Sequence, residues 1–156
     1  MPMAPNLALT HARTIVGISA PLVTVEAHIS NGLPGFSMVG LAETAVRESK
    51  DRVRSAIINS GLKFPSKRLT VNLAPADLPK HGSRFDLAIA MAILAPSKQI
   101  EIDELSQYEF MGKLELSGLI RAVPYRFIPT IESQNEHFNF GLPEDNSPES
   151  QLCQYT

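Results

Sequence analysis

Cysteine is almost absent from the chain, since Cys153 is the only one among 156 residues. A single cysteine forms no intramolecular disulfide and cannot supply a cysteine-based zinc site, and its polar surroundings do not favour a catalytic nucleophile. No segment reaches the roughly 20 continuous apolar residues of a membrane span. The first residues show no basic region followed by an apolar core, so no signal peptide is predicted. These absences predict a cytoplasmic protein without membrane contact.

Positive charge is also limited, because the formal net charge is −2. That value is not typical of a strongly basic nucleic-acid-binding protein. The charge is uneven, however: residues 1–100 hold 11 Lys and Arg against 6 Asp and Glu, whereas residues 101–156 hold 3 against 10. Such a dipole can orient a partner or an adjacent domain. The length and the apolar content of 44% suit one globular domain.

Residues 65–95 are the stretch around which the rest is organised. Leu69, Val71 and Leu73 alternate with polar residues, which predicts a strand with one buried face. Between residues 85 and 94 Asp86 is the only polar residue, which predicts a helix buried on most sides. The segment between them is rich in proline and glycine, which break regular structure. A polar loop between two buried elements is where a fold usually displays functional groups.

Other segments predict further strands and a helix. Strands are predicted over residues 14–18 and 22–31, with His28 facing solvent by parity. Residues 42–60 predict an amphipathic helix that stops at Gly61. Residues 110–123 predict a hairpin with Leu114 and Leu116 on one face and a turn at Ser117-Gly118. We expect a flexible N-terminus over residues 1–11, frayed or forming an edge strand, a folded domain over 12–128 and an atypical acidic tail over 129–156.

The predicted helix over 42–60 carries a cluster of cations opposite its apolar stripe. Its basic residues continue into the segment after it, where Lys63 also lies, and the candidates for nucleic-acid contact are Arg47, Lys50, Arg52, Arg54, Lys67 and Arg68. One interpretation is an ordinary solvated helix face with pairs such as Glu48 and Arg52. The other is a basic surface for a phosphate backbone or an acidic neighbour.

Sequence patterns for metal, nucleotide or hydrolytic chemistry are weak. The four histidines are far apart and show no ligand spacing, so no metal site is predicted from His11, His28, His81 and His137. The glycine-containing turn at 31–36 lacks both phosphate-loop patterns. Ser83 could be combined with His81 and Asp77 or Asp86 as a triad, or with Lys80 as a dyad. The simpler interpretation makes Ser83 a helix cap and Asp86 a carboxylate favoured by the helix dipole.

Two long segments resemble a known family. The segments SNGLPGFSMVGLAETAVRESKDRVRSAI at 30–57 and VNLAPADLPKHGSRFDLAIAMAIL at 71–94 are similar to the N-terminal domain of the ComM/YifB family of bacterial magnesium-chelatase-like AAA+ ATPases. The likeness runs from about residue 12 to residue 123, and LPEDNSPE at 142–149 resembles a degraded form of the next family segment. It implies an α+β fold of the ribosomal protein S5 domain 2 type, similar to the Lon proteolytic domain.

The resemblance also implies a larger machine. The complete family member would be a hexameric, ATP-driven motor that promotes DNA branch migration in natural transformation, with ATP and Mg²⁺ in its AAA+ module. No Walker A motif occurs in these 156 residues. The resemblance therefore predicts that the chain is an excised domain, a truncated product or a remnant, without ATPase activity or cofactors of its own.

The Lon comparison predicts a degenerate active-site loop. The Lon nucleophile lies in PKDGPSAG, whereas this chain has PKHGSRFD at 79–86, so Arg84 occupies the serine position and Ser83 is displaced by one. The position that matches the catalytic lysine of Lon is about Phe127, and Lys80 belongs to the loop itself. We therefore expect no enzyme in this chain. We also expect residues 124–136 to depart from the alanine-rich helix of the family.

These observations lead to one expected function and two alternatives. We expect a non-catalytic domain of a ComM-like motor that serves assembly with the AAA+ module, contact with single-stranded or branched DNA, or both. The first alternative is a packing domain without a ligand. The second is a residual hydrolase that uses Ser83 with Lys80 or His81.

Overall fold

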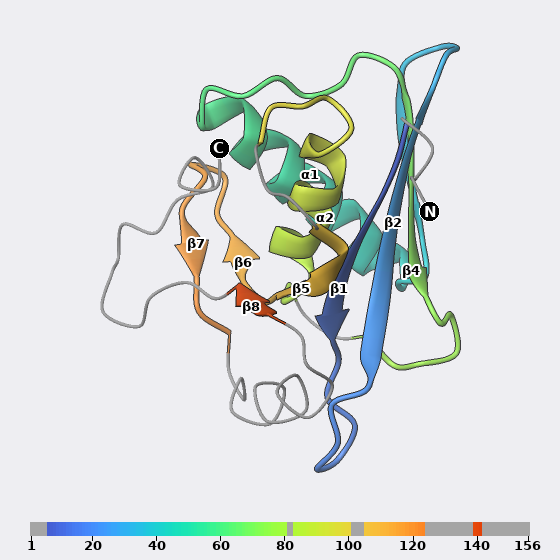
Figure 1. Cartoon of the computed structure of the whole chain (residues 1–156), viewed down its shortest axis with the longest axis vertical. Helices are drawn as coiled ribbons and strands as arrows, with labels where there is room; N and C mark the ends of the chain where they lie inside the picture. The colour runs from blue at the N-terminus through green and yellow to red at the C-terminus, as the bar shows by residue number, and fades with distance from the viewer. Residues whose placement is uncertain (1–5, 81–82, 101–104, 124–138, 142–156) are drawn as a thin grey trace.

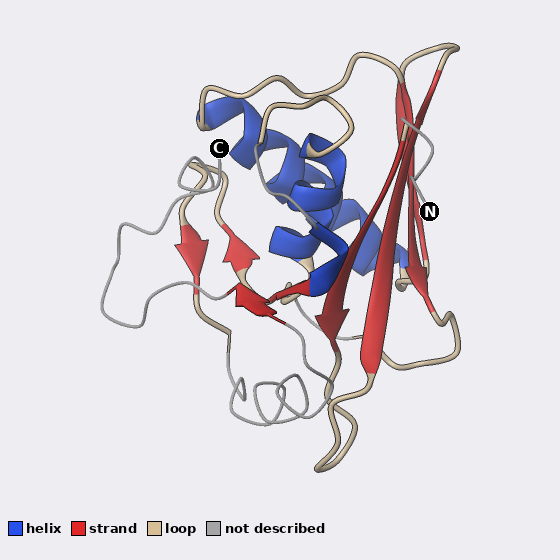
Figure 2. Ribbon diagram, in the orientation of Figure 1, coloured by secondary structure: helices blue, strands red, loops and turns tan. Residues whose placement is uncertain are grey.

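The computed structural model describes residues 6–80, 83–100, 105–123 and 139–141. Two helices cover one face of a six-stranded mixed sheet, and a small hairpin lies on the other side of the helices (Figures 1 and 2). The helices are α1 (Glu43–Asn59) and α2 (Asp86–Leu94), with a short 3₁₀ turn at Leu105–Gln107. The strands are β1 (Leu7–Arg13), β2 (Leu22–Ser30), β3 (Gly35–Val39), β4 (Arg68–Ala74), β5 (Tyr108–Phe110), β6 (Lys113–Leu114), β7 (Ile120–Arg121) and β8 (Asn139–Gly141). The chain is thus a mixed α+β domain.

The strand order of the main sheet is β3-β4-β2-β1-β5-β8. Strand β2 pairs antiparallel with both β1 and β4, whereas β3–β4, β1–β5 and β5–β8 pair in parallel. The hairpin of β6 and β7 forms a separate two-stranded sheet. Both long predicted strands that flank the core, 22–31 and 69–73, are confirmed as β2 and β4.

The core lies between the sheet and the two helices. Every residue of α2 is buried, which confirms the helix predicted from the apolar run. Helix α1 buries only one stripe, containing Ser49, Val53, Ala56 and Ile57, as the amphipathic pattern predicted. It ends just before Gly61, whose φ of 79° lies in the left-handed region that favours glycine. Helix α2 is therefore the central element and α1 its outer cover.

The beginning of the chain is a correction to the sequence analysis. Residues 7–11 are not a flexible terminus or an edge strand, because β1 lies between β2 and β5. Its alternating buried positions Ala8, Thr10 and Ala12 are small, and the fourth buried residue, Arg13, is charged, so the strand gives a weak hydrophobic signal. Small side chains let α2 approach closely, and Thr10 Oγ1 donates to the Ala88 carbonyl at 2.8 Å.

The segment predicted as a strand over 14–18 is instead the turn between β1 and β2. Thr14 N donates to the Pro21 carbonyl, and Val16 and Ser19 form an isolated bridge. The strand prediction was wrong because the β propensity of Thr, Ile and Val depends on context, and here the hydrogen bonds of the turn prevail. Ile18 is 89% exposed at the tip of this turn.

The hairpin predicted over 110–123 is confirmed at its turn. The predicted placing of Leu114 and Leu116 on one buried face is wrong for Leu116. Gly118 has φ 97° and its N–H donates to the Glu115 carbonyl, as expected for a turn. Leu114 is buried, but Leu116 is 56% exposed because the chain has already left the strand. His28 is exposed, as its parity predicted. Apart from β8, the acidic tail lies outside the described residues, and within those residues no helix is long and apolar enough to cross a membrane.

Candidate functional site

Helix α1 divides its four basic residues between two faces. Arg47, Lys50 and Arg54 follow one another at spacings of three and four, so they form a single stripe. Arg52 lies about 160° around the helix from Arg54, given 100° per residue. The four cations therefore cannot act as one surface.

Arg52 is held by a buried carboxylate. Its Nε donates to Asp86 Oδ2 at 2.7 Å, and its side chain is only 18% exposed. Asp86 also accepts hydrogen bonds from Ser49 Oγ at 2.9 Å and from the backbone N–H of Leu114 at 3.2 Å. This network joins α1, α2 and β6. We therefore separate Arg52 from the other five predicted contact residues, because its guanidinium already serves the core.

Asp86 is the first residue of α2, where the helix dipole favours a carboxylate as the sequence predicted. The dipole is only part of its role, since its carboxylate accepts hydrogen bonds from residues of α1 and β6. The cap prediction for Ser83 is wrong: Phe85 occupies the N-cap position and no side chain caps the helix. Ser83 instead accepts a hydrogen bond from Asp86 N through its backbone carbonyl, at 3.1 Å. A cap is dispensable here because tertiary contacts fix the start of α2.

The exposed stripe of α1 meets two aromatic rings. Lys50 Nζ lies 5.6 Å from the ring centroid of Phe36 in β3, and Arg54 Cζ lies 5.6 Å from the centroid of Phe64. The two ring centroids are 5.4 Å apart. Distances of this size place both cations within range of a cation–π attraction. The rings therefore position the cations of α1 over the edge of the sheet.

The start of β4 brings two more cations to the same edge. Lys67 and Arg68 are exposed, and Gly35 N donates to the Lys67 carbonyl at 3.4 Å while Gly35 pairs with Arg68 in the sheet. Lys67 and Arg68 thus lie next to β3, the strand that carries Phe36. Together with the exposed Lys63, we call Arg47, Lys50, Arg54, Lys63, Lys67 and Arg68 the basic edge. Five of the six predicted contact residues thus lie on one stripe of α1 or at the start of β4, with Arg47 paired to Glu43 at 4.0 Å and Arg68 on the sheet face opposite to the buried Leu69.

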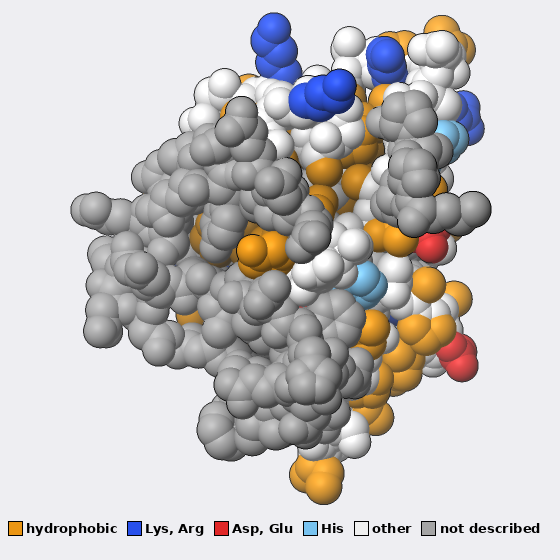
Figure 3. Space-filling model, viewed as in Figure 1, with side chains coloured by type: hydrophobic (Ala, Val, Ile, Leu, Met, Phe, Trp, Pro, Cys, Tyr) orange, Lys and Arg blue, Asp and Glu red, His pale blue; other side chains and the backbone are white. Residues whose placement is uncertain are grey.

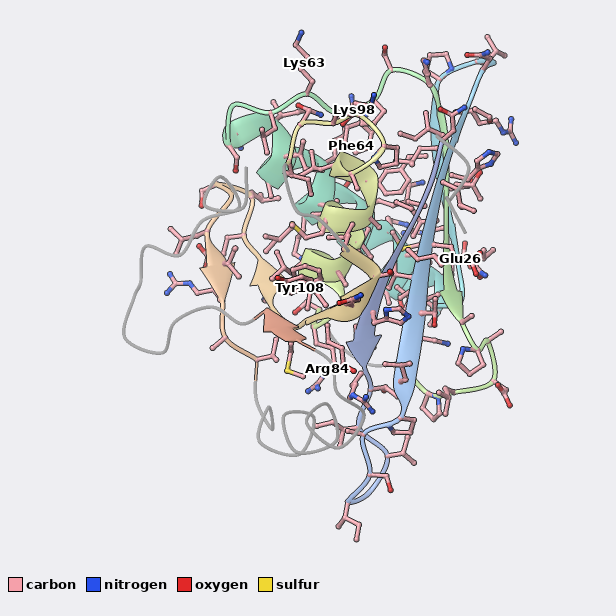
Figure 4. The ribbon with its side chains drawn as sticks, in the orientation of Figure 1. Glu26, Lys63, Phe64, Arg84, Lys98 and Tyr108 are labelled. Carbon is pink, nitrogen blue, oxygen red and sulfur yellow. The ribbon has the colours of Figure 1, made fainter. Side chains whose placement is uncertain are left out.

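Two grooves open on either side of the segment 63–66. One has a volume of about 530 Å³ and is lined by residues that include Phe36, Arg54, Lys63 and Phe64. The other has a volume of about 330 Å³, and its lining includes Lys63, Phe64, Lys67 and Gln99. Figure 3 shows Lys and Arg side chains gathered at this end of the molecule, and Figure 4 shows Lys63, Phe64 and Lys98 there, in the half of the view away from Arg84.

The wall of the smaller groove is fixed by one side chain. Gln99 Oε1 accepts from Lys63 N and Gln99 Nε2 donates to the Lys63 carbonyl, both at 2.7 Å. This clamp ties the loop after α2 to the segment after α1. The neighbouring Lys98 is exposed and has φ 57°, a conformation that glycine adopts at lower cost. Sequence analysis missed Phe36, Phe64 and Lys98, because no local pattern marks a ring or a loop lysine that meets a distant helix.

The loop between β4 and α2, which was compared with the Lon active-site loop, has its lysine bound by backbone carbonyls. Lys80 is 7% exposed, and its Nζ donates to the carbonyls of Pro75 and Leu78. Thr14 Oγ1 donates to the Pro79 carbonyl at 2.6 Å and anchors the same loop. Burial lowers the pKa of Lys80 and of the half-buried Arg84. His81 and Phe127 lie outside the described residues. In the described part of this loop, Lys80 and Thr14 therefore stabilise the loop through hydrogen bonds to its backbone carbonyls.

We expect Lys80→Met to lower the free energy of unfolding by about 1–2 kcal/mol, because two carbonyls lose a charged donor. Urea denaturation measures the change. The control is Lys67→Met, an exposed lysine whose replacement is expected to stay within about 0.5 kcal/mol. Equal effects of the two substitutions would contradict a structural role for Lys80.

A metal site finds no support among the residues that the structure describes, where no three His, Cys, Asp or Glu side chains gather. His11 pairs with Glu109 across β1 and β5, and burial lowers its pKa. Glu109 itself is bound by the buried Arg13, whose Nη2 lies 2.6 Å from Glu109 Oε1. This cluster ties β5 to β1. His137 lies outside the described residues.

Comparison with known proteins identifies the class of this α+β domain. Residues 25–146 match the family described as subunit ChlI of Mg-chelatase, and the chain belongs to that family. It is 51% identical to the uncharacterized protein YifB of Salmonella typhimurium over 144 residues and 50% identical to YifB of Escherichia coli. It is 49% identical over 148 residues to the competence protein ComM of Haemophilus influenzae.

These matches cover 92–94% of the chain but only 28–29% of the length of the three relatives. The predicted resemblance to ComM/YifB proteins is thereby confirmed. The activity of the longer relatives cannot be assigned directly to the 156 residues present here.

Proposed function

We propose that this chain is a non-catalytic DNA-contacting domain of a ComM-like AAA+ motor, and that the basic edge is its DNA surface. The similarity to a competence protein supports a role in the handling of transforming DNA. In the complete protein, the AAA+ module would bind ATP and Mg²⁺ and assemble a hexamer that drives branch migration. We also propose that the domain has a fold of the ribosomal protein S5 domain 2 type, related to the Lon proteolytic domain.

One observation carries this proposal: cations from α1 and from the start of β4 converge around two aromatic rings. Lys50 and Arg54 lie over Phe36 and Phe64, and Lys67 follows in the next segment. A merely solvated helix face would carry cations without gathering others from distant segments. Cations at this spacing address phosphates rather than bases, so the contact is expected to be weak and sensitive to salt.

The test is fluorescence anisotropy with single-stranded and branched DNA across a salt series. Removing two cations by Lys67→Ala/Arg68→Ala is expected to weaken binding at low salt by about tenfold or more. It should also reduce the slope of log K against log salt by about 1.4 on single strands, given a slope of about 0.7 for each phosphate neutralised. The affinity and the slope should change together, because each released counterion contributes to both.

The matched control is Lys113→Ala/Arg121→Ala, which removes the same charge from the β6–β7 hairpin. If this control weakened binding as much as the first variant, the effect would come from net charge alone and not from the basic edge. No binding by the unmodified domain at low salt would refute DNA contact. The basic edge would then be assigned to packing against an acidic surface of the AAA+ module.

A further inference from the structure

We infer that the two grooves beside Phe64 receive unpaired nucleobases, so that the basic edge is specific for single-stranded rather than duplex nucleic acid. This inference rests on the proposed function and specifies the class of nucleic acid. A surface that only neutralises phosphates needs no hollow and no aromatic lining. Here the cations border two grooves whose linings share Lys63, Phe64, Pro65 and Ser66.

Phe64 is placed where a base could reach it. It follows α1 in the short connection to β4, packs against the core, Phe36 and Arg54, and is only partly buried. Both grooves use Phe64 as part of their wall. Aromatic rings and arginine planes are the groups on which proteins stack unpaired bases, independently of sequence.

The size and charge of the grooves fit the same occupant. Their volumes of about 530 and 330 Å³ lie within the roughly 300–1,000 Å³ of small-molecule sites. Lys63 borders both grooves, Arg54 borders the larger and Lys67 the smaller. A strand crossing the 63–66 segment would thus meet a cation beside each base position. Bases within a duplex are stacked on one another and cannot enter such grooves.

The loop that closes the smaller groove adds a further cation at a conformational cost. Lys98 adopts φ 57°, a conformation in which a non-glycine residue carries backbone strain of the kind that occurs at binding sites. Its backbone N–H donates to the Ala95 carbonyl at 3.1 Å in the turn after α2, and the neighbouring Gln99 clamps Lys63. Glycine would fit this position without strain, so the lysine side chain is the feature gained. Lys98 does not line this groove but lies between two residues that do, Ser97 and Gln99, and would contact the phosphate next to the base bound there.

The experiment compares three probes by anisotropy at low salt: an oligothymidylate of about 12 nucleotides, the same strand with abasic positions, and a duplex of equal length. The wild-type domain is expected to bind oligothymidylate about 5- to 100-fold more tightly than the abasic strand, as the stacking of one or more bases implies. Phe64→Leu should lose that difference while binding the abasic strand as the wild type does.

Two variants complete the design. Lys98→Gly removes a cation without straining the loop, and it should weaken binding of the normal and abasic strands by the same factor. Tyr108→Leu removes a partly exposed ring that stacks on Phe110 at a centroid distance of 6.1 Å, outside both grooves, and should change neither ratio. Thermal unfolding of each variant shows that it remains folded.

The outcomes separate the inference from the proposed function. Equal binding of the normal strand, the abasic strand and the duplex would overturn base recognition and leave DNA contact in place. An equal loss on the normal and abasic strands in Phe64→Leu would also overturn it, since the ring would then shape the groove rather than stack. Binding of none of the three probes would refute the proposed function itself.

Discussion

Replacement of Asp86 by asparagine is expected to lower the free energy of unfolding by about 3–5 kcal/mol, among the largest effects of any single substitution in this chain. Both carboxylate oxygens accept hydrogen bonds, from Ser49, Arg52 and the backbone of Leu114. An asparagine offers one oxygen and one NH₂ group, so a donor would face a donor at one end. Arg52, which is 18% exposed, would also keep a charge without its partner.

A double-mutant cycle separates the pair from the rest of the network. Arg52→Gln alone should cost less than Asp86→Asn, because glutamine retains a donor and Arg52 is the more exposed partner. The double variant should be more stable than the sum of the two single effects predicts, since it leaves no charge unpaired. Chemical denaturation of the four proteins measures the coupling. A coupling near zero would contradict the assignment of Arg52 to the core, and Arg52 would return to the DNA surface.

Asp86 also gives the stability a defined pH dependence. Burial raises the pKa of Asp86 above its ordinary 3.8, and the hydrogen bonds from Arg52, Ser49 and Leu114 oppose that rise without cancelling it. Between 3.8 and the raised pKa the folded state therefore holds a proton that the unfolded state has released. The part of the stability that depends on this bound proton is therefore full below pH 3.8 and is lost as the pH rises through the folded pKa, whereas the hydrogen bonds that the carboxylate accepts from Arg52, Ser49 and Leu114 remain above it. The difference between wild type and Asp86→Asn, measured from pH 3 to about 7, should show this fall.

Much of the fold could be predicted because the central elements carry strong periodic signals. The alternation of Leu69, Val71 and Leu73 needs only one buried face, and β4, paired with β2 on one edge and β3 on the other, provides that face. The apolar run after Asp86 similarly predicts a helix that is buried on most sides, because it has no polar face to expose to water. Strand β1 lacked such a signal, since alanines and Thr10 form its buried face and the close approach of α2 makes them necessary.

The candidate site was predictable in its charges but not in its geometry. The spacing of Arg47, Lys50 and Arg54 already separates them from Arg52 on a helical wheel, and that test needs no structure. What the sequence could not reveal is that Asp86, more than thirty positions away, binds Arg52. Phe64 had no recognisable role either, because its meeting with Arg54 depends on how the chain turns after α1.

The turn between β3 and α1 sets the position of the helix that carries three residues of the basic edge. Gly40 in this turn is expected to tolerate substitution poorly. Gly40 has φ 99°, and a Cβ added there would lie 2.1 Å from the Leu73 carbonyl oxygen and 2.9 Å from its carbonyl carbon. Leu73 is buried and paired with Val25, so its backbone cannot withdraw. Gly40→Ala is therefore expected to cost about 2–5 kcal/mol, combining left-handed strain with overpacking.

Gly17→Ala is the matched control for Gly40→Ala. Gly17 also has a positive φ, 62°, but no atom lies within 4 Å of an added Cβ. It should therefore show only the backbone strain, about 1–2 kcal/mol. Urea denaturation of both variants measures the difference, which is the cost of the contact with Leu73. If the two variants lost equal stability, a steric contact between a Cβ at position 40 and the backbone of Leu73 in β4 would be contradicted. The placement of α1 over Phe36 would then need another explanation, because this turn sets where Lys50 meets that ring.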